Sequence, residues 1–464
     1  MFLKRVELTN VRCIRSMNVP LTVPSGVTRR WTLLLGENGV GKSTLMRSIG
    51  LVLSGSAALA ELIGEPESWI RFGEAEASIA ADLVTAEGEE RHISLRIRRG
   101  DTIKELYANN RETLELLDRA IARASRNYLV IGYGASRRLS STKLSTQTVT
   151  SRFQHARANH VATLFSADAM LNPLETWAID LHYRLQDEGL RIVDEAMRKL
   201  LPGMTFKGID RARRDLMFET VDGEVPLAYL SDGYQNMAAW CGDLLFRITD
   251  TFEDYKDPLA ARGVLIVDEI DLHLHPVWQR QLRNFLTDMF PNFQFILSTH
   301  SALTAQQAGE GELFVMKRPA PDEAPIVEQS LIEPRTMAVH QLLLSPVFNL
   351  ATTDSVSVET MKNEYKRLSA AAGRTADEQM RLAQLEDELR NLPDWSVTPE
   401  RDRRQQQLLG EIQTALAQLP SASRRPAKIV KKRSPAKKKP ATKKAAAKKA
   451  AKKASRKARP RRRR

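Results

Sequence analysis

The chain has 464 residues, of which 42% are hydrophobic, so it can bury a core in two or three packed units at roughly 100 to 200 residues each. No apolar run reaches about 18 residues, and the first residues alternate apolar with charged side chains, which predicts a cytoplasmic protein without a membrane span. The two cysteines, Cys13 and Cys241, have no close cysteine or histidine partner, which argues against a disulfide framework and a zinc site.

The net charge of +14 is divided unevenly along the chain. Residues 424–464 hold 22 of the 70 Lys and Arg residues and no Asp or Glu, which leaves 48 basic against 56 acidic residues in 1–423, a net charge of −8. This basic segment has no aromatic residue, so we expect it to be disordered in isolation. Such segments bind nucleic-acid phosphates without reading bases, which would place the protein on the nucleoid. A solubilising extension or a localisation address is the alternative.

The first part of the chain reads as strands around one helix. Residues 2–11 alternate apolar and polar side chains, and the apolar run in 29–36 ends in glycine, as in a strand buried on both faces. A helix is expected from Lys42 to about Leu53. Two alternating segments around a Glu-Gly turn in 76–100 predict an antiparallel hairpin layer. The sequence NYLVIGYGASRR, residues 127–138, predicts another buried strand followed by a loop.

The middle of the chain predicts helices and then a further hairpin. Apolar residues from Pro173 to Leu201 keep helical spacing, interrupted at Gly189, and indicate a helical insertion over about 160–202. Strand-like alternation returns in 214–230 around an Asp-Gly turn, which is a hairpin signal.

Beyond residue 355 the pattern changes to leucines at steps of three and four residues. This spacing is typical of a coiled-coil seam and predicts two short helices, broken at Pro393. A helical hairpin packed on its own domain and an interface with a partner explain the spacing equally well. The two sets are Leu382, Leu385, Leu389 and Leu392, and then Leu409, Ile412, Leu416 and Leu419.

The sequence GENGVGKST matches the phosphate-loop pattern and lies between a predicted strand and a predicted helix. Its glycines let consecutive backbone N–H groups surround a phosphate, and the helix N-terminus adds partial positive charge. Lys42 is expected to reach the β- and γ-phosphates of ATP, and Ser43 to bind Mg²⁺. The expected nucleotide-binding residues are Gly36, Asn38, Gly39, Gly41, Lys42, Ser43 and Thr44.

Two later strands end in polar residues that suit the same chemistry. VLIVDEID places Asp268 and Glu269 at the end of an apolar run, with the first carboxylate expected near Mg²⁺ and the second polarising a water for attack. FQFILSTHS ends near His300, which is positioned like a γ-phosphate sensor. Alone, an acidic pair would be a solvated loop and a single histidine a structural residue; their order after a phosphate loop favours catalysis by Lys42, Glu269 and His300.

The stretch LSDGYQ, residues 230–235, begins a predicted helix. Ser231 suits the N-cap position, and Gly233 falls in the first turn. The apolar residues that follow recur at helical spacing and define one buried face. A helix start alone explains this stretch.

The order phosphate loop, LSDGYQ, VDEID and STHS resembles the ABC-type ATPases, and within them the SMC, RecF and OLD-like branch of soluble AAA-family ATPases. In that family two heads enclose two ATP molecules, so the resemblance implies an ATP-dependent homodimer or higher oligomer. It also implies that Ser231 and Gly233 of one head contact the γ-phosphate held by the other. The Asp232 carboxylate would repel that phosphate, so we expect its side chain to point away.

The resemblance covers about residues 1–316 and implies an α/β fold. We expect an ABC-type P-loop ATPase head in 1–350, with a mixed or parallel sheet, an antiparallel β layer and the helical insertion. C-terminal helices in 351–422 and a disordered basic tail in 423–464 complete the predicted order. The glutamine loop of the family is not recognisable; IGYGASRR occupies its neighbourhood, with Arg137 or Arg138 as the polar contact.

Residues 340–368 and the leucine-spaced helices after them resemble the C-terminal part of ATPase subunits from Septu-type and retron-linked antiphage systems. That likeness implies an ATPase that gates a separate HNH-type nuclease in bacterial defence. Two other functions fit the same motifs. One is a DNA-repair or chromosome-associated ATPase held on DNA by the basic tail, and the other is a nucleotide-sensing scaffold with low turnover.

Overall fold

The computed structural model describes residues 1–85, 88–123, 129–139, 153–201, 203–210, 212–221, 223–252, 258–272, 274–320, 322–371, 373–390 and 392. The chain forms two compact units, Met1–Asp354 and Ser355–Arg464. The predictions for the second leucine set and for the basic tail lie outside the described residues.

A six-stranded sheet forms the centre of the first unit, in the order β15-β14-β3-β13-β12-β6. The five strands from β14 to β6 run parallel, and β15 pairs antiparallel with β14. This mixed sheet, whose strands β3, β12 and β13 are buried almost throughout, confirms the α/β expectation. The strands are β3 (Trp31–Gly36), β6 (Val130–Tyr133), β12 (Gly263–Val267), β13 (Phe293–Thr299), β14 (Leu313–Lys317) and β15 (Ile326–Gln329).

The sheet separates two hydrophobic cores. Alternate residues of β3 face opposite ways, so that Leu33 and Leu35 lie in one core and Leu34 in the other. Cross-strand register brings Trp31 beside Phe295, with ring centroids 5.2 Å apart. The strand that carries the phosphate loop is therefore packed on both faces.

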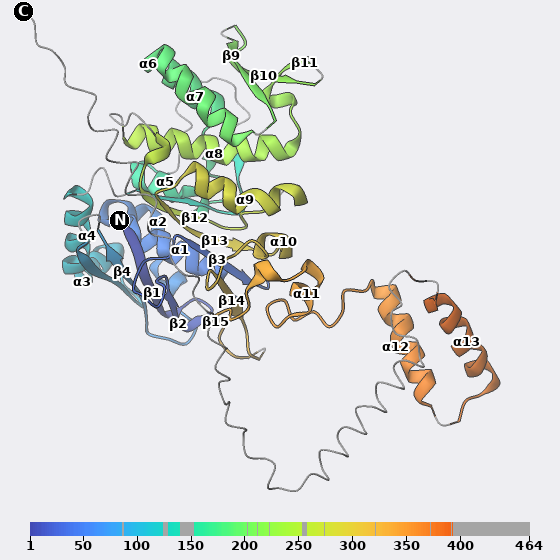
Figure 1. The fold of residues 1–464 in the computed structure, drawn as a ribbon. Helices are drawn as coiled ribbons and strands as arrows, with labels where there is room; N and C mark the ends of the chain where they lie inside the picture. The colour runs from blue at the N-terminus through green and yellow to red at the C-terminus, as the bar shows by residue number, and fades with distance from the viewer. Residues whose placement is uncertain are drawn as a thin grey trace, which may run out of the picture. The chain divides into compact units, whose positions relative to one another are not determined.

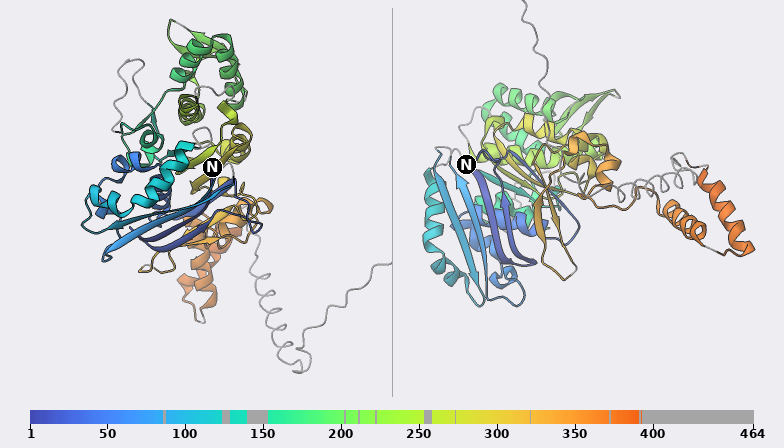
Figure 2. Two further views of the ribbon diagram at one scale, coloured as in Figure 1. Left: turned by 90° about the vertical axis from the view of Figure 1, so that its left-hand side faces the viewer. Right: turned by 60° about the horizontal axis from the view of Figure 1, so that its bottom comes forward.

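An antiparallel sheet in the order β2-β1-β4-β5 contributes to the Leu34 core. Its long strands, drawn in blue, lie at the opposite end of the first unit from α6 and α7 (Figure 2). The expected hairpin layer is confirmed, with Glu76 opposite Arg98 and Val84 opposite Glu90. The elements are β1 (Phe2–Val11), β2 (Ile14–Pro20), β4 (Glu76–Val84) and β5 (Glu90–Arg98), with helices α1 (Lys42–Leu53), α2 (Ser56–Ile63), α3 (Ile103–Asn109) and α4 (Arg111–Arg123).

Helices cover the opposite face of the central sheet (Figure 1). The long helix α8 packs against α6 and α7, and a three-stranded sheet in the order β11-β10-β9 packs beside α7. The hairpin expected around the Asp-Gly turn is β10 with β11. These elements are α6 (Leu174–Leu185), α7 (Asp187–Leu200), β9 (Thr205–Asp210), β10 (Asp215–Thr220), β11 (Gly223–Pro226) and α8 (Asp232–Thr251).

The break expected at Gly189 was misplaced. The two helices meet at Gln186, which has a positive φ of 51°, and Gly189 lies inside α7. A Cβ atom at Gly189 would stand 2.3 Å from the carbonyl oxygen of Leu181, so the glycine permits close approach of α6 instead of ending a helix.

The other helices and strands of the first unit connect these layers. They are α5 (Ala156–Phe165), α9 (Pro276–Met289), α10 (Ala302–Ala305), α11 (Val339–Leu344), β7 (Arg138–Leu139) and β8 (Met170–Leu171). Among the described residues, no helix has the length and apolar character needed to cross a membrane.

The described part of the second unit contains the helices α12 (Val356–Ala370) and α13 (Ala376–Arg390). The leucine spacing predicts α13 correctly, and Leu385 and Leu389 are buried. Its partner is α12, which lies in the region 351–422 expected to be helical but was not singled out as a helix. Leu368 is buried in α12, and Arg381 forms an ion pair with Glu364 at 2.9 Å. Two of the four residues of the first leucine set, Leu385 and Leu389, are thus buried in this helical hairpin.

Candidate nucleotide-binding site

The phosphate loop leaves the end of β3 and enters α1, as the sequence predicts. Gly39 and Gly41 have φ values of 81° and 98°, which side chains other than glycine rarely adopt. A Cβ atom at Gly36 would lie 2.3 Å from the carbonyl oxygen of Met316 on β14, so this glycine is needed for strand packing. Asn38 is exposed on the loop. The loop leaves backbone N–H groups and the start of α1 available to an anion.

Lys42 closes the loop. Its side chain is buried, and Nζ donates hydrogen bonds to the carbonyl oxygens of Gly36 and Glu37, both at 2.8 Å. Burial lowers the pKa of Lys42, although the Asp268 and Glu269 carboxylates act in the opposite direction. The Lys42 ammonium group is therefore subject to the electrostatic attraction of Asp268 and Glu269, the two carboxylates expected at the site from the sequence.

Ser43 and Asp268 meet across 225 positions of sequence. The Ser43 hydroxyl donates to one oxygen of the Asp268 carboxylate at 2.5 Å, and the Ser298 hydroxyl donates to the other at 2.5 Å. Asp268 is buried at the end of β12, beside β13. A hydroxyl and a carboxylate oxygen are ligands that Mg²⁺ accepts together with phosphate oxygens, so the residue pair fits that ion.

Glu269 has a left-handed backbone with a φ of 51°. Side chains bind both of its main-chain groups: its N–H donates to the Ser298 hydroxyl at 2.8 Å, and its carbonyl accepts from Nη2 of Arg137 at 2.5 Å. These contacts offset the cost of a conformation that non-glycine residues rarely adopt. The sequence predicts Arg137 or Arg138 only as a polar contact in the neighbourhood of the family's glutamine loop.

His300 is exposed just after β13. Partial desolvation and the nearby Lys42 lower the pKa of its imidazole, while Glu269, Asp271 and Asp268 raise it. Desolvation raises the pKa of Asp271, although a 2.5 Å hydrogen bond from Thr299 opposes that shift. The structure thus brings His300 and Lys42 into one electrostatic group with Asp268 and Glu269.

The start of α8 stands apart from this group. Ser231 occupies the N-cap position but is exposed and forms no capping hydrogen bond through its side chain, contrary to the simplest expectation. A Cβ atom at Gly233 would meet nothing within 4 Å. Within the described part of the chain, no hydrogen bond or ion pair joins Ser231 or Gly233 to the phosphate loop. The side-chain orientation predicted for Asp232 lies outside what the structure describes.

A protein-family model described as "AAA domain, putative AbiEii toxin, Type IV TA system" matches residues 32–305, more than half of the chain. The chain belongs to this AAA-domain family. The match runs from β3 to α10 and so contains the phosphate loop, the start of α8, the Asp268–Glu269 pair and His300. The mixed six-stranded sheet and the antiparallel sheet confirm the expected α/β fold with an antiparallel β layer.

The chain is also similar to individual proteins. The Septu protein PtuA of Bacillus mycoides is 27% identical over 371 residues, 79% of this chain and 48% of that protein. The chain thus spans about half the length of that relative. The retron Ec83 probable ATPase of Escherichia coli is 31% identical over 147 residues, 32% of this chain and 27% of that protein. The SMC head domain from Thermotoga maritima aligns with a TM-score of 0.39 and 14% identity, over 72% of this chain and 100% of that domain.

A buried polar network links α8 of the AAA domain to the sheet edge beside the site. Asp243 on α8 accepts hydrogen bonds from the Tyr133 hydroxyl at 2.8 Å, from Nε of Arg247 at 2.5 Å, and from the Asn172 backbone and side chain at 2.8 and 2.7 Å. The Tyr133 carbonyl in turn accepts from the Asp268 N–H at 2.8 Å. Sequence reasoning missed this network; the signal was an Asp and an Arg four residues apart among the apolar residues at the centre of α8.

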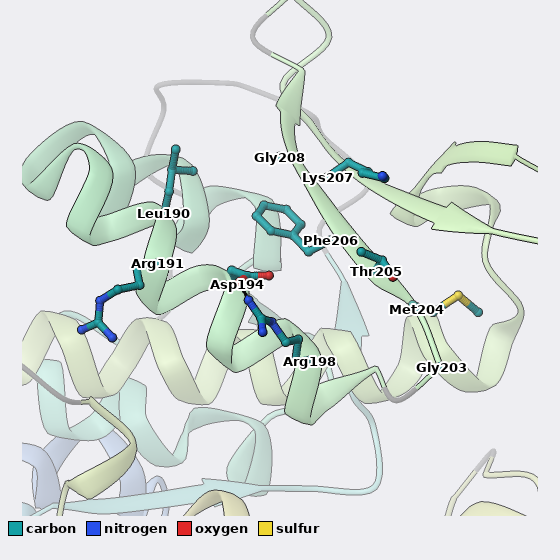
Figure 3. Close-up of a pocket in the computed structure, with 10 residues that line it drawn as sticks. All are labelled: Leu190, Arg191, Asp194, Arg198, Gly203, Met204, Thr205, Phe206, Lys207 and Gly208. Carbon is teal, nitrogen blue, oxygen red and sulfur yellow. Dashed lines mark hydrogen bonds and ion pairs between the residues drawn. The ribbon is translucent and has the colours of Figure 1, made fainter.

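The AAA domain also has an open groove of about 940 Å³ between α7 and β9 (Figure 3). Its cations already have partners, because Arg198 pairs with Asp194 on α7 and Lys207 pairs with Glu219 at 2.7 Å. None of the residues that line it belongs to the phosphate loop. The groove is therefore separate from the nucleotide site.

Proposed function

We propose that this AAA domain binds and hydrolyses ATP at the loop formed by residues 36–44. The observation that carries the proposal is the 2.5 Å hydrogen bond between Ser43 and Asp268, since it joins the start of α1 to the end of β12. The sequence and the geometry together support it: glycines with positive φ, a buried lysine and two carboxylates converge at the carboxyl ends of parallel strands.

Each residue has a proposed role. The backbone N–H groups of Gly36, Asn38, Gly39, Gly41 and Thr44 surround the phosphates, and Lys42 leaves its loop carbonyls to bind the β- and γ-phosphates. Ser43 and Asp268 would hold Mg²⁺, which neutralises charge on phosphate oxygens when bound. Glu269 takes a proton from the attacking water as general base, and His300 contacts the γ-phosphate.

Turnover and binding test these roles separately. Lys42→Ala should lose ATP binding, whereas Glu269→Gln should bind ATP like the parent and release phosphate about 10² to 10⁴ times more slowly. Glu224→Gln, an exposed residue of β11, is the matched control and should retain both properties. Parental turnover in Glu269→Gln, or no ATP binding by the parent with Mg²⁺, contradicts the proposal.

We further propose that two copies close around ATP, with Ser231 and Gly233 of one copy on the γ-phosphate held by the other. The exposed Ser231 hydroxyl, which caps nothing, and the open space at Gly233 support this contact. Ser231→Arg should keep ATP binding and lose both ATP-dependent dimerisation and hydrolysis, measured by light scattering and phosphate release. Ser25→Arg, in an exposed turn, should retain all three. If Ser231→Arg still forms ATP-dependent dimers, Ser231 does not contact the γ-phosphate of the other copy and serves only to begin α8.

For the biological role, we propose an ATPase that gates a nuclease partner of HNH type in antiphage defence. The similarity to a Septu protein and to a retron ATPase supports this role. Affinity purification from the native host, with ATP and the Glu269→Gln variant, should recover a nuclease. Recovery of DNA-repair or chromosome proteins instead would support the second function, for which the basic segment 424–464 is the favouring observation.

A further inference from the structure

Arg137 lies in the loop after β6, next to the strand that ends in Asp268. The protein fixes the course of this loop. The Gly134 N–H donates to the Thr163 hydroxyl at 3.2 Å, and the Ser136 hydroxyl donates to the Ala167 carbonyl at 3.1 Å. A Cβ atom at Gly134 would stand 2.2 Å from the Thr163 carbonyl oxygen, so only glycine fits. The Arg137 side chain therefore starts from a constrained backbone.

One half of the guanidinium is occupied by the protein. Nη2 donates to the Glu269 carbonyl at 2.5 Å, across 132 positions of sequence. With the Ser298 hydroxyl on the Glu269 N–H, this bond holds the left-handed backbone of Glu269. A charge-assisted bond of this kind is stronger than a bond between neutral groups.

The other half of the guanidinium has no partner. Nη1 is buried and, among the described residues, forms no hydrogen bond. Desolvation lowers the pKa of Arg137 to about 10, with Asp271, Asp268 and Glu269 opposing that shift, so the group remains charged at neutral pH. A buried donor without an acceptor destabilises the protein, whereas the same donor is well placed for an anionic oxygen.

The same carboxylates surround Arg137 and the residues of the nucleotide site. Asp268, Glu269 and Asp271 act on Arg137 and also on His300, and two of them act on Lys42. An anion that approaches Lys42 and His300 therefore enters the field of Arg137 as well. ADP and ATP differ by the terminal phosphate, which is the anionic group nearest to a catalytic base.

We propose that Arg137 distinguishes ATP from ADP: Nη1 binds an oxygen of the terminal phosphate while Nη2 holds the Glu269 backbone. The inference rests on the proposed ATPase function and adds a second residue, in addition to His300, by which the site detects the terminal phosphate. Because one guanidinium joins the two groups, the position of Glu269 depends on whether that phosphate is present.

Equilibrium binding of ADP and of the non-hydrolysable analogue AMP-PNP, both with Mg²⁺ and the full-length chain, tests this role. Arg137→Ala should weaken the analogue about tenfold, equivalent to about 1.4 kcal/mol, and leave ADP affinity within about twofold. Arg137→Lys, which keeps the charge, should lose less analogue affinity than Arg137→Ala. Arg374→Ala, which removes a guanidinium bound to the Leu368 carbonyl in the second unit, should change neither affinity.

The outcomes separate the two proposals. Equal loss of ADP and analogue affinity in Arg137→Ala would make Arg137 structural, and unchanged affinities would make it irrelevant to the phosphate; either result overturns the inference while ATP binding by the parent stands. A Lys42→Ala variant that binds both nucleotides like the parent overturns the ATP site itself, and the inference with it.

Discussion

The buried pair of Asp243 and Arg247 offers a quantitative test of how α8 is fixed to the nucleotide site. The exposed fractions of these two side chains are 0% and 9%. Asp243→Leu would leave the Arg247 charge without its carboxylate and the Tyr133 hydroxyl and Asn172 amide without their acceptor. Breaking a buried pair from one side lowers the free energy of unfolding by about 3–5 kcal/mol.

The reverse variant breaks the same pair. In Arg247→Leu, Asp243 keeps the donors of Tyr133 and Asn172 but loses its cation, and the Asn159 carbonyl loses the 2.7 Å bond from Nη1, so we expect a loss in the same range of about 3–5 kcal/mol. The double variant should be less destabilised than the sum of the single variants, because it leaves no uncompensated charge.

Urea unfolding followed by tryptophan fluorescence measures these differences, since Trp240 lies on α8 and its ring is 5.9 Å from that of Tyr133. Arg111→Ala is the control: it removes an exposed ion pair with Glu115 at the same spacing and should leave the unfolding midpoint unchanged. If the single losses simply add in the double variant, or if Asp243→Leu behaves like the control, the two side chains are not coupled as described.

Three further predictions follow from charge and backbone geometry. Burial lowers the pKa of His160 to about 3, so below its ordinary pKa of 6.5 only the unfolded chain takes up this proton. The free energy of unfolding therefore falls by about 1.4 kcal/mol for each unit by which the pH decreases. In urea unfolding between pH 7 and 5, His160→Gln should lose less stability with decreasing pH than the parent. Gly41→Ala should weaken ATP binding, because φ is 98° and the new Cβ would lie 3.0 Å from the Cys13 sulfur, whereas Gly373→Ala has open space and should not. Deleting 424–464 should weaken DNA binding uniformly across sequences and flatten its salt dependence.

Each of these has a clear opposite result. Equal pH slopes in the parent and in His160→Gln would mean that another group causes the acid sensitivity. Parental ATP affinity in Gly41→Ala would show that the loop does not require its left-handed backbone. Unchanged DNA affinity after the deletion would assign the tail to solubility or addressing.

The local parts of the site were predictable from sequence. A phosphate loop needs glycines, a lysine and a hydroxyl at fixed spacing, so Gly41, Lys42 and Ser43 could be chosen from neighbours in the chain alone. Asp268 and Glu269 followed because a short apolar run marks a buried strand and its end. These signals depend on backbone geometry within a few residues.

Contacts between distant segments were not predictable in this way. The bond from Arg137 to Glu269 exists because β6 lies beside β12, and that neighbour relation arises from packing of the whole sheet. The break at Gln186 was hidden because Gly189 looks like a helix breaker, whereas its role is set by the α6 backbone next to it. Helix α12 was not singled out because it lacks the repeated leucines that marked α13, and Leu368 is its one leucine.

The placement of β3 between two cores determines how far the effect of a ligand can spread. Leu34 lies in the core shared with the antiparallel sheet, and Leu33 lies in the core shared with α8. Neither core can open locally without disturbing the strand before the phosphate loop. A nucleotide held by that loop should therefore slow amide hydrogen exchange on both sides of the sheet, including strands that never touch it. Nucleotide binding at the loop would then reduce local opening throughout the ATPase head.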